Sequence, residues 1–143
     1  MYQKIIIVGN LGRDPEMRYM ADGTAVTNLS VATNRRWSDR NTGEQREQTT
    51  WFRVSVWGRQ AETVNQYLSK GRRVLVEGRL EADPQTGGPR LFTRQDGTVG
   101  ASYEIRAFTV RFLGGRDETY ETYDSDQSFE SESAAEEEDD IPF

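Results

Sequence analysis

The sequence predicts an all-β protein: a five-stranded barrel with one helix between its third and fourth strands, followed by a disordered acidic tail. Three observations support this prediction. Residues 24–35 and 49–58 alternate apolar and polar side chains with the period of two that is typical of half-buried strands. Residues 59–71 repeat apolar side chains with helical spacing. From residue 116 onward Asp, Glu, Ser and Thr dominate, which bury too little apolar surface to fold. We therefore expect a domain of residues 1–115 and a tail of residues 116–143.

The first strand is predicted at Lys4–Val8, a run of apolar β-branched residues that ends at Gly9. An apolar run without alternation indicates a strand that is buried on both faces. In a small barrel one face fills the core and the other can meet a second subunit, so this run is a first indication of an oligomer. A short strand is expected at Met17–Met20, and Asp22 followed by Gly23 predicts a hairpin turn.

The second strand is predicted at Thr24–Arg35, with Ala25, Leu29 and Val31 on one side and polar residues on the other. Residues 38–48 contain no apolar residue, which predicts a loop. Between the strand and this loop lies an indole among arginines, a pairing that suits unstacked nucleobases. The alternative is a solvent-exposed start of the loop in which only the Trp side chain is partly buried. The residues of this cluster are Arg35, Arg36, Trp37 and Arg40.

The third strand is predicted at residues 49–58, where Phe52, Val54 and Val56 form the core side. The other side presents Trp51 and Trp57 with Arg53 between them. Exposed aromatic rings next to a cation are what unstacked bases bind. The alternative is that both faces are buried and the two indoles pack under another element.

An amphipathic helix is predicted at residues 59–71. Ala61, Val64 and Leu68 recur on one face, Tyr67 joins that face, and Lys70 in the last turn precedes a terminating Gly71. The fourth strand follows at residues 73–80. It directs Val74, Val76 and Leu80 inward, and Gly78 marks a bend or the close approach of another backbone.

Residues 81–100 are rich in Gly, Pro and Asp and predict a long protruding hairpin that carries Leu91 and Phe92 between Arg90 and Arg94. The alternative is a flexible linker. The last strand is predicted at Tyr103–Leu113. Its apolar pattern changes phase partway along, which predicts a β-bulge or a strand that is buried on both faces.

The charge of the chain is divided sharply. Residues 1–116 hold all 18 Lys and Arg and 12 of the 24 Asp and Glu, a net charge of +6, whereas residues 117–143 carry −12. A basic body with an acidic tail suggests that the body binds nucleic acid. The chain has no Cys and no His, which excludes thiolate and imidazole metal sites and the usual His-based catalysis. We expect no cofactor and no enzyme activity. The absence of Cys suits a reducing cytoplasm, and no signal peptide or membrane span is expected.

The predicted order of elements is that of the oligonucleotide/oligosaccharide-binding barrel. That fold binds its ligand on the face of its second and third strands and on its long loops. Four aromatic residues fall at these places in this chain: Trp37, Trp51, Trp57 and Phe92.

The chain resembles the bacterial single-stranded DNA-binding protein family over nearly its whole length. The matching segments are Gly9–Pro15, Arg18–Met20, Trp51–Val54, Tyr67–Gly71, Val76–Leu80 and Asp139–Phe143. The resemblance implies a homotetramer, associated with the nucleoid, that wraps single-stranded DNA without sequence preference, and it assigns base stacking to the four aromatic residues. The resemblance and the basic residues noted above together give the candidate phosphate contacts. These are Arg35, Arg36, Arg40, Arg53, Arg59, Lys70, Arg73, Arg79 and Arg90.

The last five residues, Asp139, Asp140, Ile141, Pro142 and Phe143, form an apolar tip behind a run of acids. Such a tip is typical of a peptide that binds a hydrophobic pocket with a basic rim, and the alternative is an accidental terminus. The resemblance implies that it recruits replication, recombination and repair proteins.

The chain departs from the family at two positions: Phe52 stands where His is frequent, in a region of subunit contacts, and Phe92 stands where Trp is common. The competing functions are an RNA-binding or cold-shock-like barrel and a barrel that binds only proteins. A nuclease is disfavoured because the body has no acidic cluster suited to Mg²⁺.

Overall fold

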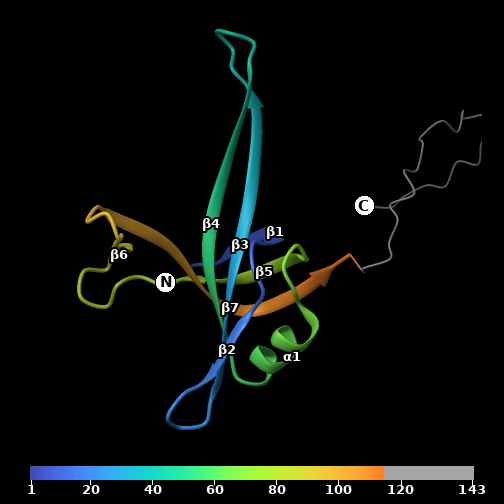
Figure 1. The fold of residues 1–143 in the computed structure, drawn as a ribbon, viewed down its shortest axis with the longest axis vertical. Coiled ribbons are helices and arrows are strands. Elements are labelled where there is room, and N and C mark those ends of the chain that lie inside the picture. Colours follow the sequence, from blue (N-terminus) through green and yellow to red (C-terminus); the bar gives the residue numbers. More distant parts are fainter. Residues whose placement is uncertain (115–143) are drawn as a thin grey trace, which may run out of the picture.

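The computed structural model describes residues 1–114, and Figure 1 shows their arrangement. Seven strands and one helix follow one another along this part of the chain. Their bounds are β1 (Ile5–Leu11), β2 (Glu16–Tyr19), β3 (Ala25–Ser38), β4 (Gln45–Trp57), α1 (Arg59–Tyr67), β5 (Arg73–Leu80), β6 (Arg90–Thr93) and β7 (Val99–Leu113).

Five of these strands close into a barrel in the order β1-β5-β7-β4-β3, and β3 returns to pair with β1. The pairing of β4 with β7 is parallel, and the other pairings of the barrel are antiparallel. Two short strands lie outside this ring: β2 pairs with β3, and β6 pairs with β7. The predicted five-stranded barrel, with its helix between the third and fourth barrel strands, is confirmed. The predicted tail lies outside the described residues, and the domain boundary after residue 115 stays a prediction.

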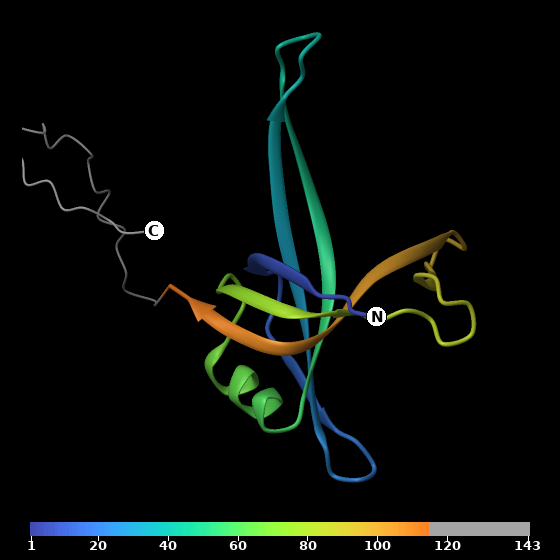
Figure 2. The ribbon, with the colours of Figure 1, turned by 180° about the vertical axis from the view of Figure 1, so that it is seen from behind.

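The core lies inside the barrel and under α1. Its members come from every barrel strand because alternate side chains point inward. The Thr27 hydroxyl donates a 2.7 Å hydrogen bond to the Ala61 carbonyl, which ties the helix to β3. Seen from behind, α1 lies near the end of the molecule opposite the tip of the β3–β4 ribbon (Figure 2). The core residues are Ile7, Leu11, Ala25, Leu29, Val31, Val54, Val56, Ala61, Val64, Leu68, Val74, Val76, Ile105 and Val110.

The prediction of a loop at residues 38–48 is wrong. β3 and β4 stay paired as far as Ser38 opposite Gln45, so only residues 39–44 form the turn of a long ribbon that projects from the barrel (Figure 1). The projecting part has no buried face and therefore needs no apolar alternation. Polar cross-strand contacts join its strands instead, such as the 2.9 Å hydrogen bond from Thr49 to Asn34.

The helix is shorter than predicted. It ends at Tyr67, because Leu68 takes up an extended backbone conformation and reaches the core from outside the helix. Lys70 and Gly71 therefore lie in the following turn and not in the last helical turn. Tyr67 does not share the buried face, since 61% of its surface is exposed.

A β-bulge accounts for the change of phase in the last strand. The partner of Glu77 is Thr109, but the partner of the next residue, Gly78, is Ala107, so Phe108 is the extra residue on β7. The prediction of a bulge is confirmed. Gly78 also approaches the carbonyl of Arg106 so closely that a Cβ would overlap it, as the sequence suggested. Leu80, predicted to point inward, is exposed; it still pairs with Ile105 of β7, but the pairing of β5 with β1 has already ended at Gly78.

Only one face of β1 is buried within residues 1–114. Ile7 belongs to the core, whereas Ile6 and Val8 are 56% and 49% exposed. The predicted core face is confirmed, and the predicted contact of the other face with a second subunit stays a prediction. The outer face of β1 leaves an apolar surface uncovered.

We predict that Gly78→Ala lowers the free energy of unfolding by about 1–3 kcal/mol, the usual cost of overpacking. The new methyl group would overlap the Arg106 carbonyl of β7, which is backbone and cannot turn aside, and would crowd the side chain of Ile105. Thermal and urea unfolding of the purified protein measure the effect. Gly88→Ala is the matched control, since its Cβ would meet only Thr86 Oγ1 at 3.5 Å. Equal stability of the two variants would contradict the close approach.

Candidate functional site

The outer face of β4 presents two indoles and a guanidinium. Trp51, Arg53, Ser55 and Trp57 share this face, because the pairing of β3 with β4 runs without a register shift. Trp51 is 53% exposed, so the alternative of burial on both faces does not hold for it.

Gly12 sets the position of the Trp51 ring. It follows β1, and its amide donates a 2.9 Å hydrogen bond to the Ser30 carbonyl of β3. A Cβ at Gly12 would overlap the six-membered ring of Trp51. The indole therefore lies against the bare backbone of Gly12 and keeps its outer side toward solvent.

Trp57 is held more firmly than Trp51. Its indole Nε1 donates a 3.3 Å hydrogen bond to Ser55 Oγ, and the guanidinium of Arg106 lies 4.7 Å from the ring centroid. Arg106 reaches the indole because it pairs with Ser55 across the parallel β4–β7 ladder. Sequence reasoning missed Arg106, since no local pattern shows which strand lies beside β4. A planar ligand that stacks on Trp57 has to use the face that Arg106 leaves free.

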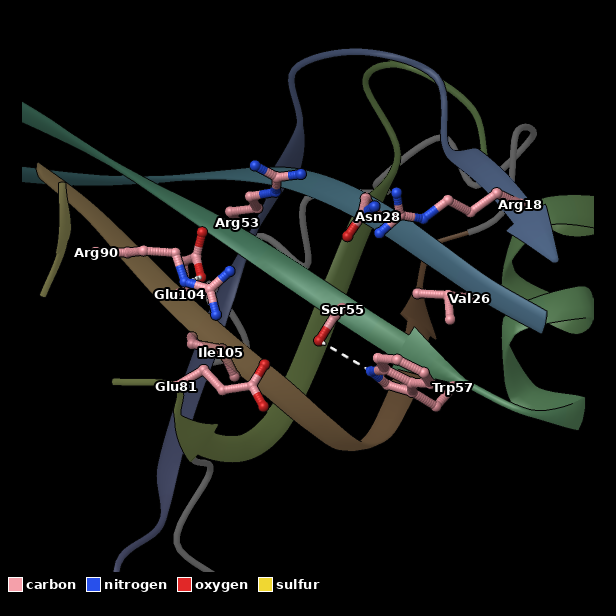
Figure 3. A pocket seen from close by; sticks show the side chains of 10 residues that line it. All are labelled: Arg18, Val26, Asn28, Arg53, Ser55, Trp57, Glu81, Arg90, Glu104 and Ile105. Atoms are coloured by element: carbon pink, nitrogen blue, oxygen red, sulfur yellow. Dashed lines mark hydrogen bonds and ion pairs between the residues drawn. The ribbon is translucent and has the colours of Figure 1, made fainter. Parts of the chain in front are cut away.

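A hollow of about 270 Å³ lies beside Trp57, and Figure 3 shows its lining. We call it the Trp57 hollow. Three predicted site residues meet there: Arg53, Trp57 and Arg90. The other side chains that line it were not predicted, since they carry no distinctive sequence signal. They are Arg18, Val26, Asn28, Ser55, Glu81, Glu104 and Ile105.

Two carboxylates partly neutralise the positive charge of the Trp57 hollow. Glu104, whose side chain is only 11% exposed, forms an ion pair of 3.2 Å with Arg90 and accepts a 3.3 Å hydrogen bond from Ser102. Glu81 lies 3.8 Å from Arg106. Arg53 makes no ion pair within residues 1–114 and is exposed, so its charge is available to a ligand.

The predicted hairpin within residues 81–100 is present as β6 paired with the first part of β7, which begins at Val99 and not at Tyr103. Register places Phe92 on the same hairpin face as Arg90, which lines the Trp57 hollow. The guanidinium of Arg94 lies 5.4 Å from the Phe92 ring centroid.

The turn of this hairpin is fixed by Asp96. Its carboxylate accepts hydrogen bonds from the hydroxyl and the amide of Thr98, and these bonds hold the pKa of Asp96 below its usual range. Gly97 takes the positive φ of 85° that the turn requires. Phe92 is thus carried by a defined hairpin and not by a flexible linker.

The ribbon does not bring Trp37 to the face of Trp51. Strict alternation along β3 and β4 places Trp37 and Arg35 on the opposite face of the ribbon. The two pack together, with the Arg35 guanidinium 5.2 Å from the Trp37 ring centroid. Arg36 does share the face of Trp51, but it forms an ion pair of 3.4 Å with Glu47. Arg40 lies in the turn of the ribbon.

The remaining predicted phosphate contacts do not line the Trp57 hollow. Arg59 begins α1 and lines a separate groove between α1 and β7. Lys70 lies in the turn before β5, and Arg73 opens that strand at the end opposite Leu80. Arg79 is exposed and pairs with Arg106. The Arg and Lys residues predicted to contact phosphates therefore lie on several different surfaces.

Residues 1–114 contain no group of three or more acidic side chains arranged to hold a metal ion. No helix in this part of the chain is long and apolar enough to cross a membrane. The predicted partner-binding peptide, Asp139–Phe143, lies outside the described residues.

Comparison with known proteins shows which class of protein carries this site. Residues 2–113 match the Single-strand binding protein family, and the chain belongs to that family. The barrel is therefore an oligonucleotide/oligosaccharide-binding fold.

Three solved structures show the similarity. The chain is 30% identical to a single-strand binding protein of Plasmodium falciparum solved in complex with single-stranded DNA, with a TM-score of 0.64 over 80% of this chain and 97% of that one. A deletion mutant of the single-stranded DNA-binding protein from Thermus aquaticus is 32% identical, with a TM-score of 0.60 over 79% of this chain and 51% of that one. A small single-stranded DNA-binding protein from Streptomyces coelicolor is 26% identical, with a TM-score of 0.62 over 78% and 94% of the two chains.

Proposed function

We propose that this protein binds single-stranded DNA without sequence preference, through base stacking and phosphate contacts. The observation that carries the proposal is the exposed Trp51 indole beside the exposed Arg53 on the outer barrel face of a Single-strand binding protein family member. A similar protein from Plasmodium falciparum was solved with single-stranded DNA, which supports the same ligand here.

The proposed mechanism makes and breaks no covalent bond. Unpaired bases stack on Trp51, on the free face of Trp57 and on Phe92, and Trp37 adds a contact on the other face of the ribbon. Arginines track the phosphates and release bound counterions, so affinity falls as salt rises. Because every base has a π face, stacking tolerates any sequence. Duplex DNA binds poorly, since its bases already stack on one another.

The acidic tail serves a separate purpose in this proposal. Residues 117–143 carry twelve acids and no base, and they end in the apolar residues Ile141–Phe143. Such a peptide suits the hydrophobic, basic-rimmed pocket of a partner protein. We propose that it recruits replication, recombination and repair proteins to single-stranded DNA on the nucleoid in the cytoplasm. The protein itself acts as a binding protein and not as an enzyme.

We also propose that the protein is a homotetramer. Ile6 and Val8 lie exposed on the outer face of β1, beside Leu75 of the paired strand β5. Contiguous exposed apolar side chains of this kind mark protein–protein interfaces. A second chain that covers this face would remove them from water.

We predict that Trp51→Ala weakens binding of oligo-dT about tenfold. In single-strand binding barrels themselves, stacking on one aromatic side chain is worth about 1–3 kcal/mol per base, and a tenfold change corresponds to about 1.4 kcal/mol. Titration of intrinsic Trp fluorescence measures the affinity, with oligo-U at the same salt as the comparison for RNA. Tyr67→Ala, which removes an exposed ring outside the site, is the control. Unchanged affinity and quenching in Trp51→Ala would remove Trp51 from the site.

The salt dependence of binding tests the role of Arg53. A contact with one phosphate of a single strand contributes about 0.7 to the slope of log K against log salt. Arg53→Gln should therefore reduce this slope by about 0.7, whereas Arg53→Lys should keep it, because the charge remains. Titrations with oligo-dT at four salt concentrations give the slopes. The same slope in the wild type and Arg53→Gln would exclude a phosphate contact at this residue.

We expect the double variant Ile6→Glu, Val8→Glu to fold but to lose the tetramer, because charged side chains on the outer face of β1 would be buried unpaired at the interface. Light scattering coupled to gel filtration gives the mass, and circular dichroism checks the fold. Val99→Glu, at an exposed valine of the β6–β7 hairpin, is the control. A double variant that keeps the mass of four chains would place the interface elsewhere, and a wild-type monomer would refute the tetramer.

Deletion of Asp139–Phe143 should leave the affinity for oligo-dT unchanged or slightly higher, because two acidic side chains that compete with phosphates are lost. The same deletion should abolish binding to replication and repair proteins. Fluorescence titration measures the first effect, and pull-down with purified partner proteins measures the second. Partner binding that survives the deletion would refute the proposed role of the tip.

A further inference from the structure

We propose that the Trp57 hollow takes a single nucleobase and that Glu81 reads the hydrogen-bonding edge of that base, favouring bases with an amino group over thymine. This inference rests on the proposed binding of single-stranded DNA. It adds a base preference at one subsite to a surface that otherwise binds any sequence.

The shape of the hollow suits one base. Its volume of about 270 Å³ lies just below the range of small-molecule pockets. This volume is enough for one planar base and not for two stacked bases. The Trp57 indole lies on one side, with one ring face under Arg106. In Figure 3 the Glu81 carboxylate points from the end of β5 toward the side of Ser55 and Trp57. A ring that enters the hollow beside Trp57 therefore has polar side chains around it.

The charged groups that line the hollow, three guanidiniums and two carboxylates, orient a nucleotide that enters it. Glu81 and Glu104 both line it, and their negative charges repel a phosphate at close range. Arg53 of β4 and Arg18 of β2 lie on the other side of the same hollow (Figure 3). There they can bind the phosphate while the base lies inside the hollow. A nucleotide at this place is thus oriented with its base inward and its backbone toward the arginines.

Glu81, unlike Glu104, keeps hydrogen-bond capacity on its carboxylate, although it forms an ion pair with Arg106. Both oxygens of Glu104 are engaged, one by Ser102 and the other by Arg90. Glu81 lies 3.8 Å from Arg106, which is beyond hydrogen-bond distance, and its side chain is 30% exposed. No side chain or amide of residues 1–114 donates a hydrogen bond to the Glu81 carboxylate. Its own amide is anchored to the Glu104 carbonyl at 2.8 Å, which fixes where the side chain starts.

A carboxylate accepts hydrogen bonds and donates none, so it selects bases by their donors. Cytosine offers its N4 amino group and adenine its N6 amino group, and a carboxylate accepts from such groups. The Watson–Crick edge of thymine has one N–H flanked by two carbonyl oxygens, and these oxygens are repelled by the carboxylate. Asn28 and Ser55 add groups that can either donate or accept, so they adapt to any base and leave the discrimination to Glu81.

The test compares the affinities of the full-length protein for oligo-dC and oligo-dT of equal length at pH 8. Because homopolymers differ in their own stacking, the quantity measured is the ratio of the two dissociation constants, Kd(dT)/Kd(dC), in the wild type and in Glu81→Gln. We expect Glu81→Gln to lower this ratio about fivefold, near the lower end of the discrimination given by a good hydrogen-bonded base contact. Glu62→Gln removes the same charge from the exposed side of α1 and should leave the ratio unchanged.

A structural role for Glu81 gives a different result. If Glu81 only holds Arg106 over Trp57, Glu81→Gln changes the affinity for both oligonucleotides by the same factor, and the inference is overturned. Glu81→Asp keeps the charge on a shorter side chain and should give an intermediate ratio, which supplies the test if Glu81→Gln does not fold. Tight binding of both oligonucleotides with an unchanged ratio in both variants overturns this inference alone. Absence of binding by the wild type overturns the proposed function as well.

Discussion

The uninterrupted antiparallel pairing of β3 with β4 decides where the indoles of this protein lie. No bulge breaks the pairing from Val26 to Ser38, so side chains alternate strictly along both strands. Trp51 and Trp57 therefore share the outer face of the barrel, and Trp37 lies on the opposite face of the projecting ribbon. A nucleic acid chain that touches both Trp51 and Trp37 has to pass around an edge of the ribbon. That path is open to a flexible single strand and closed to a duplex, which bends little over so short a distance.

β7 is the second determinant of the site. It pairs in parallel with β4 and in antiparallel fashion with β5, and its bulge at Phe108 lets Ile105 and Val110 both reach the core. The same strand brings Arg106 over Trp57 and Glu104 against Arg90. Its first residues continue past the barrel wall into the hairpin that carries Phe92. One strand thus positions the Arg106 guanidinium, the Glu104 carboxylate and the hairpin that carries Phe92.

The charge of the surface is more finely divided than the basic body and acidic tail of the sequence suggest. Within the described residues, Arg36 and Arg90 are held by carboxylates, whereas Arg53 stands free beside the exposed indole of Trp51. The carboxylates neutralise some of the arginines, and positive charge remains at those, such as Arg53, that a phosphate can reach. Ion pairs at the surface contribute little to stability, so their main effect here is on the path that a polyanion can take.

The sequence by itself determined the order of the elements, the core sides of β3 and β4, the β6–β7 hairpin and the change of phase near Phe108. Each of these follows from spacing along the chain, because a buried face demands alternation and a turn demands its own residues. Only the tertiary structure decided that residues 38 and 45–48 are strand, that α1 ends at Tyr67, and that Leu80 is exposed. It alone placed Arg106, Glu81 and Glu104 around Trp57. The physical reason is that a strand with no buried face carries no apolar pattern, and that the pairing of β4 with β7 joins residues far apart in the chain, which no local pattern records.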